Sequence, residues 1–146
     1  MNSNDARGND EQPSNLARAL WVFLGYTLVG PLLAGLSTAI LVIFASIVGV
    51  SELFSNGLPP LGIAAASTFV WAAIPSAVTA ALLLPFVIQT GTFGWIEAVT
   101  AAVLAFAIAT IVTTFPYRDG LPLFAFIAAM ISLGVREALR NAKIIE

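Results

Sequence analysis

The amino-acid sequence predicts an all-α membrane protein: a four-helix transmembrane bundle with antiparallel neighbours, short loops and both termini in the cytoplasm. Three observations lead to this fold class. The 146 residues are 59% hydrophobic and 10% charged, whereas about a quarter of the residues in a soluble domain are charged. Between Arg18 and Arg118, only Glu52 and Glu97 carry a charge. Apolar segments that approach or exceed the length needed to cross a hydrocarbon core of about 30 Å recur four times.

The chain divides into a polar tail and one membrane domain. Residues 1–15 have mixed charge and are expected to form a disordered cytoplasmic tail. Residues 16–146 form a single transmembrane domain, whose predicted spans are about 19–50, 61–89, 95–115 and 121–139. The fourth span is the shortest, because its uncharged run ends at Val135. It crosses fully only if the Arg136 side chain reaches the interface.

The distribution of basic residues predicts the orientation. Lys and Arg in short flanks favour the cytoplasmic side of a membrane. Both ends of the chain are basic, whereas Arg118 is the one basic residue of the two outer loops; the basic residues at the ends are Arg7, Arg18, Arg136, Arg140 and Lys143. We therefore expect both ends inside. The absence of a basic organelle-type presequence favours a bacterial inner (plasma) membrane.

The residue types that are missing exclude several chemistries. The chain has no cysteine and no histidine, which removes the usual ligands of haem, zinc, copper and iron–sulfur clusters. We therefore expect no cofactor and no metal. No basic field suggests nucleic acid, and no catalytic set of side chains can be assembled, so we expect no enzyme activity. An enzyme acting on lipid is the weakest alternative, because it needs ionisable groups that converge at one interface.

Prolines inside two of the spans predict kinks. Pro31 follows Gly30 in the first span, and Pro75 and Pro85 lie in the second. Each proline removes one backbone donor and crowds the carbonyl of the preceding turn. A broken helix of this kind can border a binding cavity, as in transporters. The alternative is a simple kink whose freed carbonyl is satisfied by a nearby hydroxyl or a neighbouring helix.

Small residues at four-residue spacing predict close helix packing, because backbones approach one another where side chains are small. The pattern occurs in the third and second spans, at Ala101, Ala105 and Ala109, and at Ala72, Ser76 and Ala80. These stripes face sister helices, a second copy of the chain or another protein, and the sequence does not distinguish among the three.

Glu97 is the acidic residue closest to the membrane interior. It follows Gly94 and Trp95 at the start of the third span. As an intramembrane acid it is a weak candidate for a proton or cation site. The alternative is an interfacial carboxylate that stabilises the positive end of the helix.

The sequence leaves two functions open. We expect a non-enzymatic multi-pass protein that acts as a small subunit, assembly factor or scaffold in a membrane complex, because small-residue stripes accompany an interior almost without charge. Its partners are then the lipid bilayer and another membrane protein or a second copy. The alternative is a small homo-oligomeric transporter or channel for a neutral or lipophilic solute. Prolines beside hydroxyls favour this alternative, as does a similarity between loops 55–61 and 118–123 that is compatible with a hairpin duplication.

Overall fold

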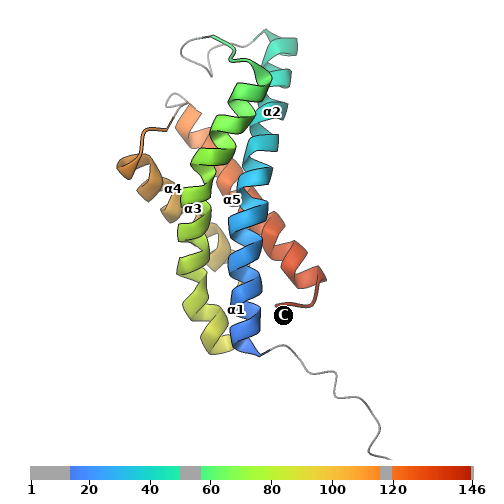
Figure 1. Cartoon of the computed structure of the whole chain (residues 1–146), viewed down its shortest axis with the longest axis vertical. Coiled ribbons are helices and arrows are strands. Elements are labelled where there is room, and N and C mark those ends of the chain that lie inside the picture. Colours follow the sequence, from blue (N-terminus) through green and yellow to red (C-terminus); the bar gives the residue numbers. More distant parts are fainter. Residues whose placement is uncertain (1–13, 50–56, 116–119, 146) are drawn as a thin grey trace, which may run out of the picture.

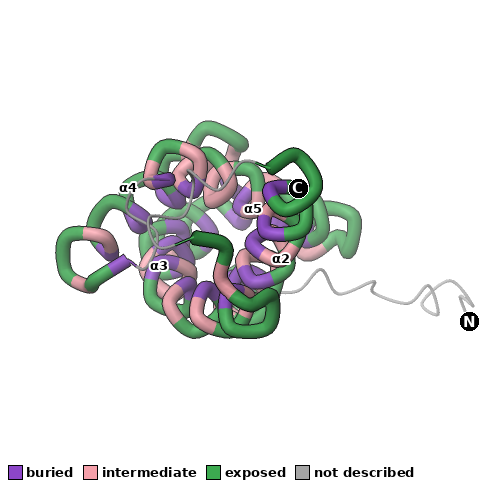
Figure 2. Tube along the Cα trace, turned by 90° about the horizontal axis from the view of Figure 1, so that it is seen from above, coloured by how far each residue is buried: buried purple, intermediate pink, exposed green. Residues whose placement is uncertain are grey.

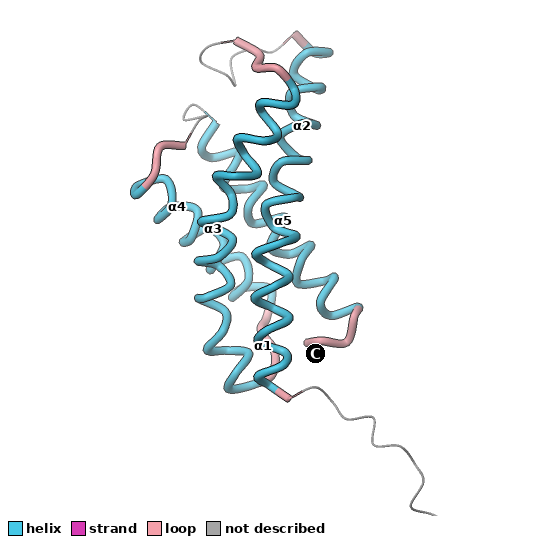
Figure 3. Tube along the Cα trace, in the orientation of Figure 1, coloured by secondary structure: helices cyan, strands magenta, loops and turns pink. Residues whose placement is uncertain are grey.

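The computed structural model describes residues 14–49, 57–115 and 120–145, and the regular elements among them are helices (Figure 1; Figure 3). In chain order these are α1 (Asn15–Leu24), the π-helical segment η1 (Gly25–Val29), α2 (Gly30–Val48), α3 (Leu61–Thr90), α4 (Trp95–Val112) and α5 (Leu121–Asn141). The first three form one uninterrupted span. The described part of the chain thus has four helices long and apolar enough to cross a membrane. The four-helix transmembrane fold is confirmed, and the length and composition of its helices make the chain an integral membrane protein.

The ends of two spans differ from the predicted bounds for local reasons. The first helix begins at Asn15 rather than at 19, because the Ser14 hydroxyl accepts a hydrogen bond from the Ala17 N–H (3.3 Å) and caps the first turn. The third span ends at Val112 rather than at 115, because Thr113 adopts extended backbone angles. Nearly all of the predicted tail, 1–15, and much of the predicted first loop lie outside the described residues.

The four spans form a ring around a common axis. Each span packs against the next one along the chain, and α5 closes the ring by packing against α2 and η1. α3 and α5 therefore lie diagonally opposite each other. Both ends of the described chain lie at the same end of the bundle (Figure 1). We call it the termini end, with residues 14–18, 91–94 and 142–145, and we call the opposite end, with residues 57–60 and 113–115, the loop end. The cytoplasmic location of the termini stays a prediction.

The outer surface of the bundle is apolar and the inner positions are mostly small. Seen along the axis, buried residues face the centre and exposed residues face outward (Figure 2). The exposed side chains are large and aliphatic or aromatic, such as Phe44, Val70, Leu104 and Ile111. Alanine makes up much of the interior. This arrangement suits a helix bundle surrounded by lipid, in which close backbone packing holds the helices together.

α2 and α3 approach closely at Gly35. A Cβ atom at this position would lie 2.9 Å from the backbone carbonyl oxygen of Ala65 and 3.3 Å from the Cβ atom of Phe69. A backbone carbonyl cannot rotate away as a flexible side chain can. The crossing therefore requires glycine.

Substitution of Gly35 by alanine is expected to lower the free energy of unfolding by about 1 to 3 kcal/mol, because α2 and α3 must separate to admit the methyl group. Gly134 in α5 is the matched control, since a Cβ atom there meets nothing within 4 Å. Gly134→Ala should leave stability unchanged or raise it, because alanine favours the helix. Thermal unfolding in detergent measures both variants. Equal effects of the two substitutions would contradict the close crossing.

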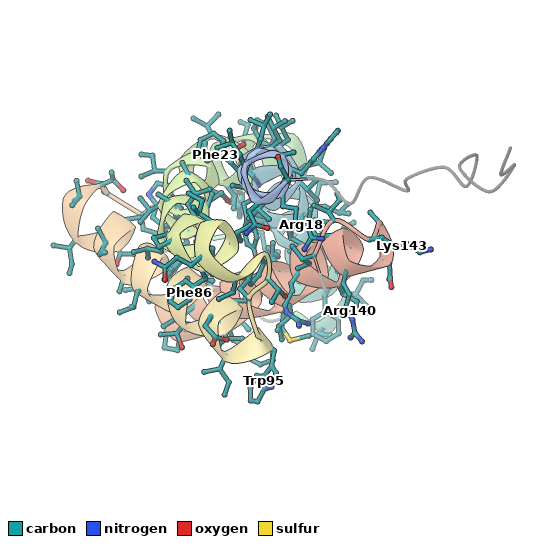
Figure 4. The ribbon with its side chains drawn as sticks, turned by 90° about the horizontal axis from the view of Figure 1, so that it is seen from below. Arg18, Phe23, Phe86, Trp95, Arg140 and Lys143 are labelled. Atoms are coloured by element: carbon teal, nitrogen blue, oxygen red, sulfur yellow. The ribbon has the colours of Figure 1, made fainter. Side chains whose placement is uncertain are left out.

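Two arginines fasten the termini end. Arg18 is only 7% exposed, and its Nη1 donates to the carbonyl of Gly91 (3.2 Å). Arg136 Nε donates to the carbonyl of Phe93 (3.1 Å). The first and fourth spans thus both hold the connection between α3 and α4. Viewed from this end, Arg18 lies between the helices, whereas Lys143 lies at the periphery (Figure 4).

The residues after α5 fold back onto the bundle. Lys143 has a positive φ of 56°, and the N–H of Ile144 donates to the carbonyl of Leu139 (3.0 Å), which is the hydrogen bond of a helix ending in a left-handed turn. Ile145 is buried with Leu139 and Val22 in the core at the termini end. The fourth helix therefore continues past Arg136 for its full 21 residues, about 31 Å of helix, which is enough to cross the hydrocarbon core.

Candidate functional site

A cavity of about 60 Å³ lies at the centre of the bundle, and all four spans line it. One buried water needs about 10 to 15 Å³ of such a volume. The cavity therefore has room for about four waters or one small molecule. The first span lines the cavity through η1 and α2 with Tyr26, Gly30 and Ala34, and α3 lines it with Thr68, Trp71, Ala72, Pro75, Ser76 and Thr79. The lining residues of α4 and the segment after it are Ala102, Phe106 and Phe115. Those of α5 are Phe124, Ile127, Ala128, Ile131 and Ser132.

The cavity exists because small residues face one another where the spans meet. Ala72, Ala102 and Ala128 come from three different helices and leave space at the axis. On the first span, Gly30 allows Ser76 to approach closely, since a Cβ atom at Gly30 would lie 2.6 Å from the Ser76 Oγ atom. The side chains around the axis are thus too short to fill the centre. A packed protein interior normally contains few voids larger than a water molecule.

Aromatic rings line the cavity toward the loop end. Trp71 stands edge-to-face against Phe115, with 4.6 Å between ring centroids, and Phe115 stands in the same way against Phe124 at 5.0 Å. Phe106 completes the group. The indole Nε1–H of Trp71 donates to Thr113 Oγ1 (2.8 Å) and fixes the orientation of the ring. We call these four rings the aromatic cap.

A hydrogen-bonded chain borders the cavity on the side of the termini end. The Tyr26 hydroxyl lies 3.1 Å from the carbonyl oxygen of Ser132 and 3.0 Å from its Oγ atom. Ser132 Oγ donates its proton to the carbonyl of Ala98 (2.8 Å), so Tyr26 acts as the donor to Ser132. The chain joins the first, fourth and third spans. Tyr26 and Ser132 are each 2% exposed.

Substitution of Tyr26 by phenylalanine tests this connection. Hydrogen bonds between transmembrane helices contribute about 0.6 kcal/mol on average and up to about 1.7 kcal/mol. We expect Tyr26→Phe to lower stability within that range. Ser132→Ala removes the same contact together with the bond to Ala98, so the double variant should lose less than the sum of the two single losses. Full additivity in thermal unfolding would show that the two hydroxyls do not interact.

Thr68 is the lining residue whose hydroxyl has no hydrogen-bond partner. It is 4% exposed, and its Oγ1 is the one fully buried side-chain polar atom without a partner among the described residues. Other threonines in the spans donate to their own helix, as Thr79 does to the carbonyl of Pro75 (2.7 Å). An unsatisfied buried hydroxyl costs about 1 to 3 kcal/mol. Such a group is expected to meet a partner that enters the cavity.

The predicted kink residues lie in different surroundings. Gly30 and Pro75 both line the cavity, on the neighbouring helices α2 and α3. Pro31 lies buried in the first turn of α2, directly after the π-helical segment Gly25–Val29, and π-helical turns are one source of helix kinks. Pro85 is exposed and lies away from the cavity. The structure thus brings Gly30 and Pro75 together and leaves Pro85 on the outer surface.

The small-residue stripes pack within this chain. Ala101, Ala105 and Ala109 of α4 are buried, as are Ala72 and Ala80 of α3. Ser76 is half-buried and lines the cavity beside Ala72. These positions therefore face sister helices.

Glu97 lies apart from the cavity. It belongs to the first turn of α4, and its carboxylate folds back over Gly94, where a Cβ atom would clash with Glu97 Oε2. A carboxylate in this position lies at the positive end of the helix. No side chain that lines the cavity is charged. Within the described residues, no group of three His, Cys, Asp or Glu side chains can hold a metal ion.

Sequence reasoning missed Tyr26 and Thr68. A tyrosine in the middle of an apolar span could have indicated Tyr26, because a buried phenol usually finds a hydrogen-bond partner. Thr68 offers no comparable signal in the sequence. Its hydroxyl is unpaired because the Ser67 hydroxyl donates to the carbonyl of Ala64.

Comparisons with protein-family models, with characterised proteins and with solved structures give no significant match to this chain. Its function is therefore argued from the geometry of the cavity.

Proposed function

We propose that this chain is a small membrane transport protein that carries a neutral solute through the centre of its own four-helix bundle. The observation that supports the proposal is the central cavity, which all four spans line and which carries hydroxyl groups but no charge. A charged solute would need a compensating charge at this depth, because an unpaired ion in the bilayer interior is costly. A neutral solute needs only hydrogen-bonding groups.

Packed side chains lie beyond the cavity toward both ends of the bundle, which favours a carrier over an open pore. The aromatic cap lies toward the loop end. Toward the termini end lies a core of buried side chains from all four spans, and the Arg18 and Arg136 contacts lie beyond it. Solute must then pass by a rearrangement of the helices, as in alternating access. The π-helical segment Gly25–Val29 borders the cavity, and π-helical turns occur frequently at functional sites.

The role as a subunit or scaffold now has less support than transport. The small-residue stripes suggested that role, but their alanines are buried against sister helices inside the bundle. Transport instead accounts for the cavity and for the unpaired hydroxyl of Thr68.

We further propose that both termini face the cytoplasm of a bacterial cell, on the basis of the basic flanks. Ala142, after the end of α5, is exposed at the termini end. A cysteine introduced there should react with a membrane-impermeant thiol reagent in inverted vesicles and not in intact cells. Labelling in intact cells would reverse the orientation.

Transport is tested by reconstitution of the purified full chain into vesicles. We expect vesicles containing the protein to admit small neutral solutes, such as short alcohols, amides or polyols, faster than protein-free vesicles of the same lipid. Light scattering after an osmotic step measures the rate of solute entry. Equal rates for every solute in the two kinds of vesicle would overturn the proposal.

A further inference from the structure

We infer that the ligand of the central cavity is a small uncharged molecule carrying one hydroxyl or amide group, and that Thr68 Oγ1 binds this group. The inference rests on the proposed function only in using the same cavity, and it concerns binding rather than movement across the membrane. It makes Thr68 a specificity-determining residue.

The first step is the reason that the Thr68 hydroxyl is unpaired. In a helix, a threonine normally donates to the carbonyl one turn earlier, which for Thr68 is the carbonyl of Ala64. That carbonyl already accepts a hydrogen bond from Ser67 Oγ (3.1 Å). The Thr68 hydroxyl, 4% exposed and part of the cavity lining, has no partner within the described protein. It can therefore both donate to and accept from a molecule in the cavity.

The second step is a missing helix donor in the same wall. Pro75 has no N–H, so the carbonyl of Trp71 loses the donor that another residue at position 75 would supply. Trp71 and Pro75 both line the cavity. One stretch of α3 thus combines a hydroxyl in the cavity lining with a backbone carbonyl that lacks its usual helix donor. A ligand with an O–H or N–H group next to an acceptor atom matches this pair, whereas a carboxylate or an ammonium ion meets no charged lining residue.

The third step is the size and the apolar part of the ligand. A volume of about 60 Å³ is well below the roughly 150 Å³ of an engineered apolar cavity that admits benzene. A molecule of about four heavy atoms fits, with its apolar part against the aromatic cap. Ligand-efficiency limits place its dissociation constant no tighter than about 40 μM. Low-millimolar binding is the expected range.

The test compares two probes of the same shape on matched variants of the full-length chain in detergent. Propan-2-ol carries a hydroxyl, and 2-chloropropane replaces the hydroxyl with chlorine. Thr68→Val removes the hydroxyl and keeps the branched shape. Thr110→Val is the control, because it makes the same change at a threonine that donates to the carbonyl of Ala107 in its own helix (2.8 Å) and does not line the cavity. Melting temperature is measured from about 1 to 20 mM probe, since a ligand that binds the folded state raises it.

We expect propan-2-ol to raise the melting temperature saturably in the wild-type chain and in Thr110→Val, and to bind Thr68→Val about three- to tenfold more weakly. 2-Chloropropane should bind all three proteins equally, because it makes no hydrogen bond that depends on Thr68. Without a probe, Thr68→Val should be as stable as the wild type or more stable, because an unsatisfied hydroxyl has been removed.

Three results would overturn the inference: an equal response of Thr68→Val and wild type to propan-2-ol, a loss of 2-chloropropane binding in Thr68→Val as large as the loss of propan-2-ol binding, or no saturable response to either probe, which would mean a cavity that holds water only. The outcome is separate from that of transport. Alcohol binding that depends on Thr68 without vesicle flux would remove the carrier and keep this ligand class. Flux that is unchanged in Thr68→Val would keep the carrier and remove this role of Thr68.

Discussion

Vesicles that contain the Ala72→Leu variant are expected to lose at least about nine-tenths of the protein-dependent solute flux, because a well-packed interior leaves no other space for the solute. Ala72 is buried in the middle of α3 and lines the cavity. Leucine places an isobutyl group where the wild-type chain has a methyl group and an empty space. The stability of the variant should change little, since the new side chain fills a void instead of displacing packed atoms.

Ala73→Leu is the matched control for this variant. Ala73 is the next residue of the same helix, is exposed at the outer surface and does not line the cavity. The same change in volume at that position should leave flux unaltered. Equal losses in both variants would mean that the effect comes from the helix as a whole. Full flux in Ala72→Leu would mean that solute does not pass through the cavity.

The Arg18→Met variant is expected to lower the free energy of unfolding by about 1.5 to 3 kcal/mol, the range for hydrogen bonds to charged groups. Arg18 is 7% exposed, and it donates to the buried carbonyl of Gly91. Methionine keeps much of the aliphatic packing and removes the guanidinium, so the carbonyl of Gly91 loses this charged donor. The connection between α3 and α4 should loosen from α1. Thermal unfolding in detergent measures the loss, and hydrogen exchange at residues 91–94 locates it.

Arg140→Met supplies the comparison for Arg18→Met. The Arg140 side chain is 57% exposed, and its nearest acid, Glu137, lies 3.8 Å away and is also exposed. Exposed ion pairs contribute between about 0 and 1 kcal/mol, so this variant should remain close to wild type. A loss at Arg140 as large as that at Arg18 would contradict the burial that sets the two arginines apart.

The spans could be predicted from the sequence because each depends on a local property. A run of about 20 apolar residues bounded by polar ones identifies a crossing wherever the run lies. The fourth span was the least certain on that basis, since its uncharged run ends at Val135. Its continuation depends on Arg136, which donates to the carbonyl of Phe93 on another part of the chain. That contact is tertiary and leaves no local pattern.

The candidate site was only partly predictable for the same reason. Prolines with hydroxyls nearby left a cavity border at Pro75 open as one of two alternatives, and Pro75 and Gly30 both line the cavity. The role of Thr68 could not be inferred, because it depends on Ser67 occupying the carbonyl of Ala64. The alanine stripes were recognised as packing surfaces. Their partners within the chain became known only from the arrangement of the helices.

The most direct test of a solute-accessible cavity uses the absence of cysteine from the chain. Ala102 and Ala105 lie on α4 and are both buried, but only Ala102 lines the cavity. A thiol reacts as its thiolate, which requires contact with water. The rate at which hydrogen peroxide, a neutral reagent smaller than the cavity, oxidises the thiols of Ala102→Cys and Ala105→Cys in vesicles should therefore differ. We expect reaction at Ala102→Cys, slowed by propan-2-ol, and almost none at Ala105→Cys. Equal rates at the two positions would contradict a solute-accessible cavity at the centre of the bundle.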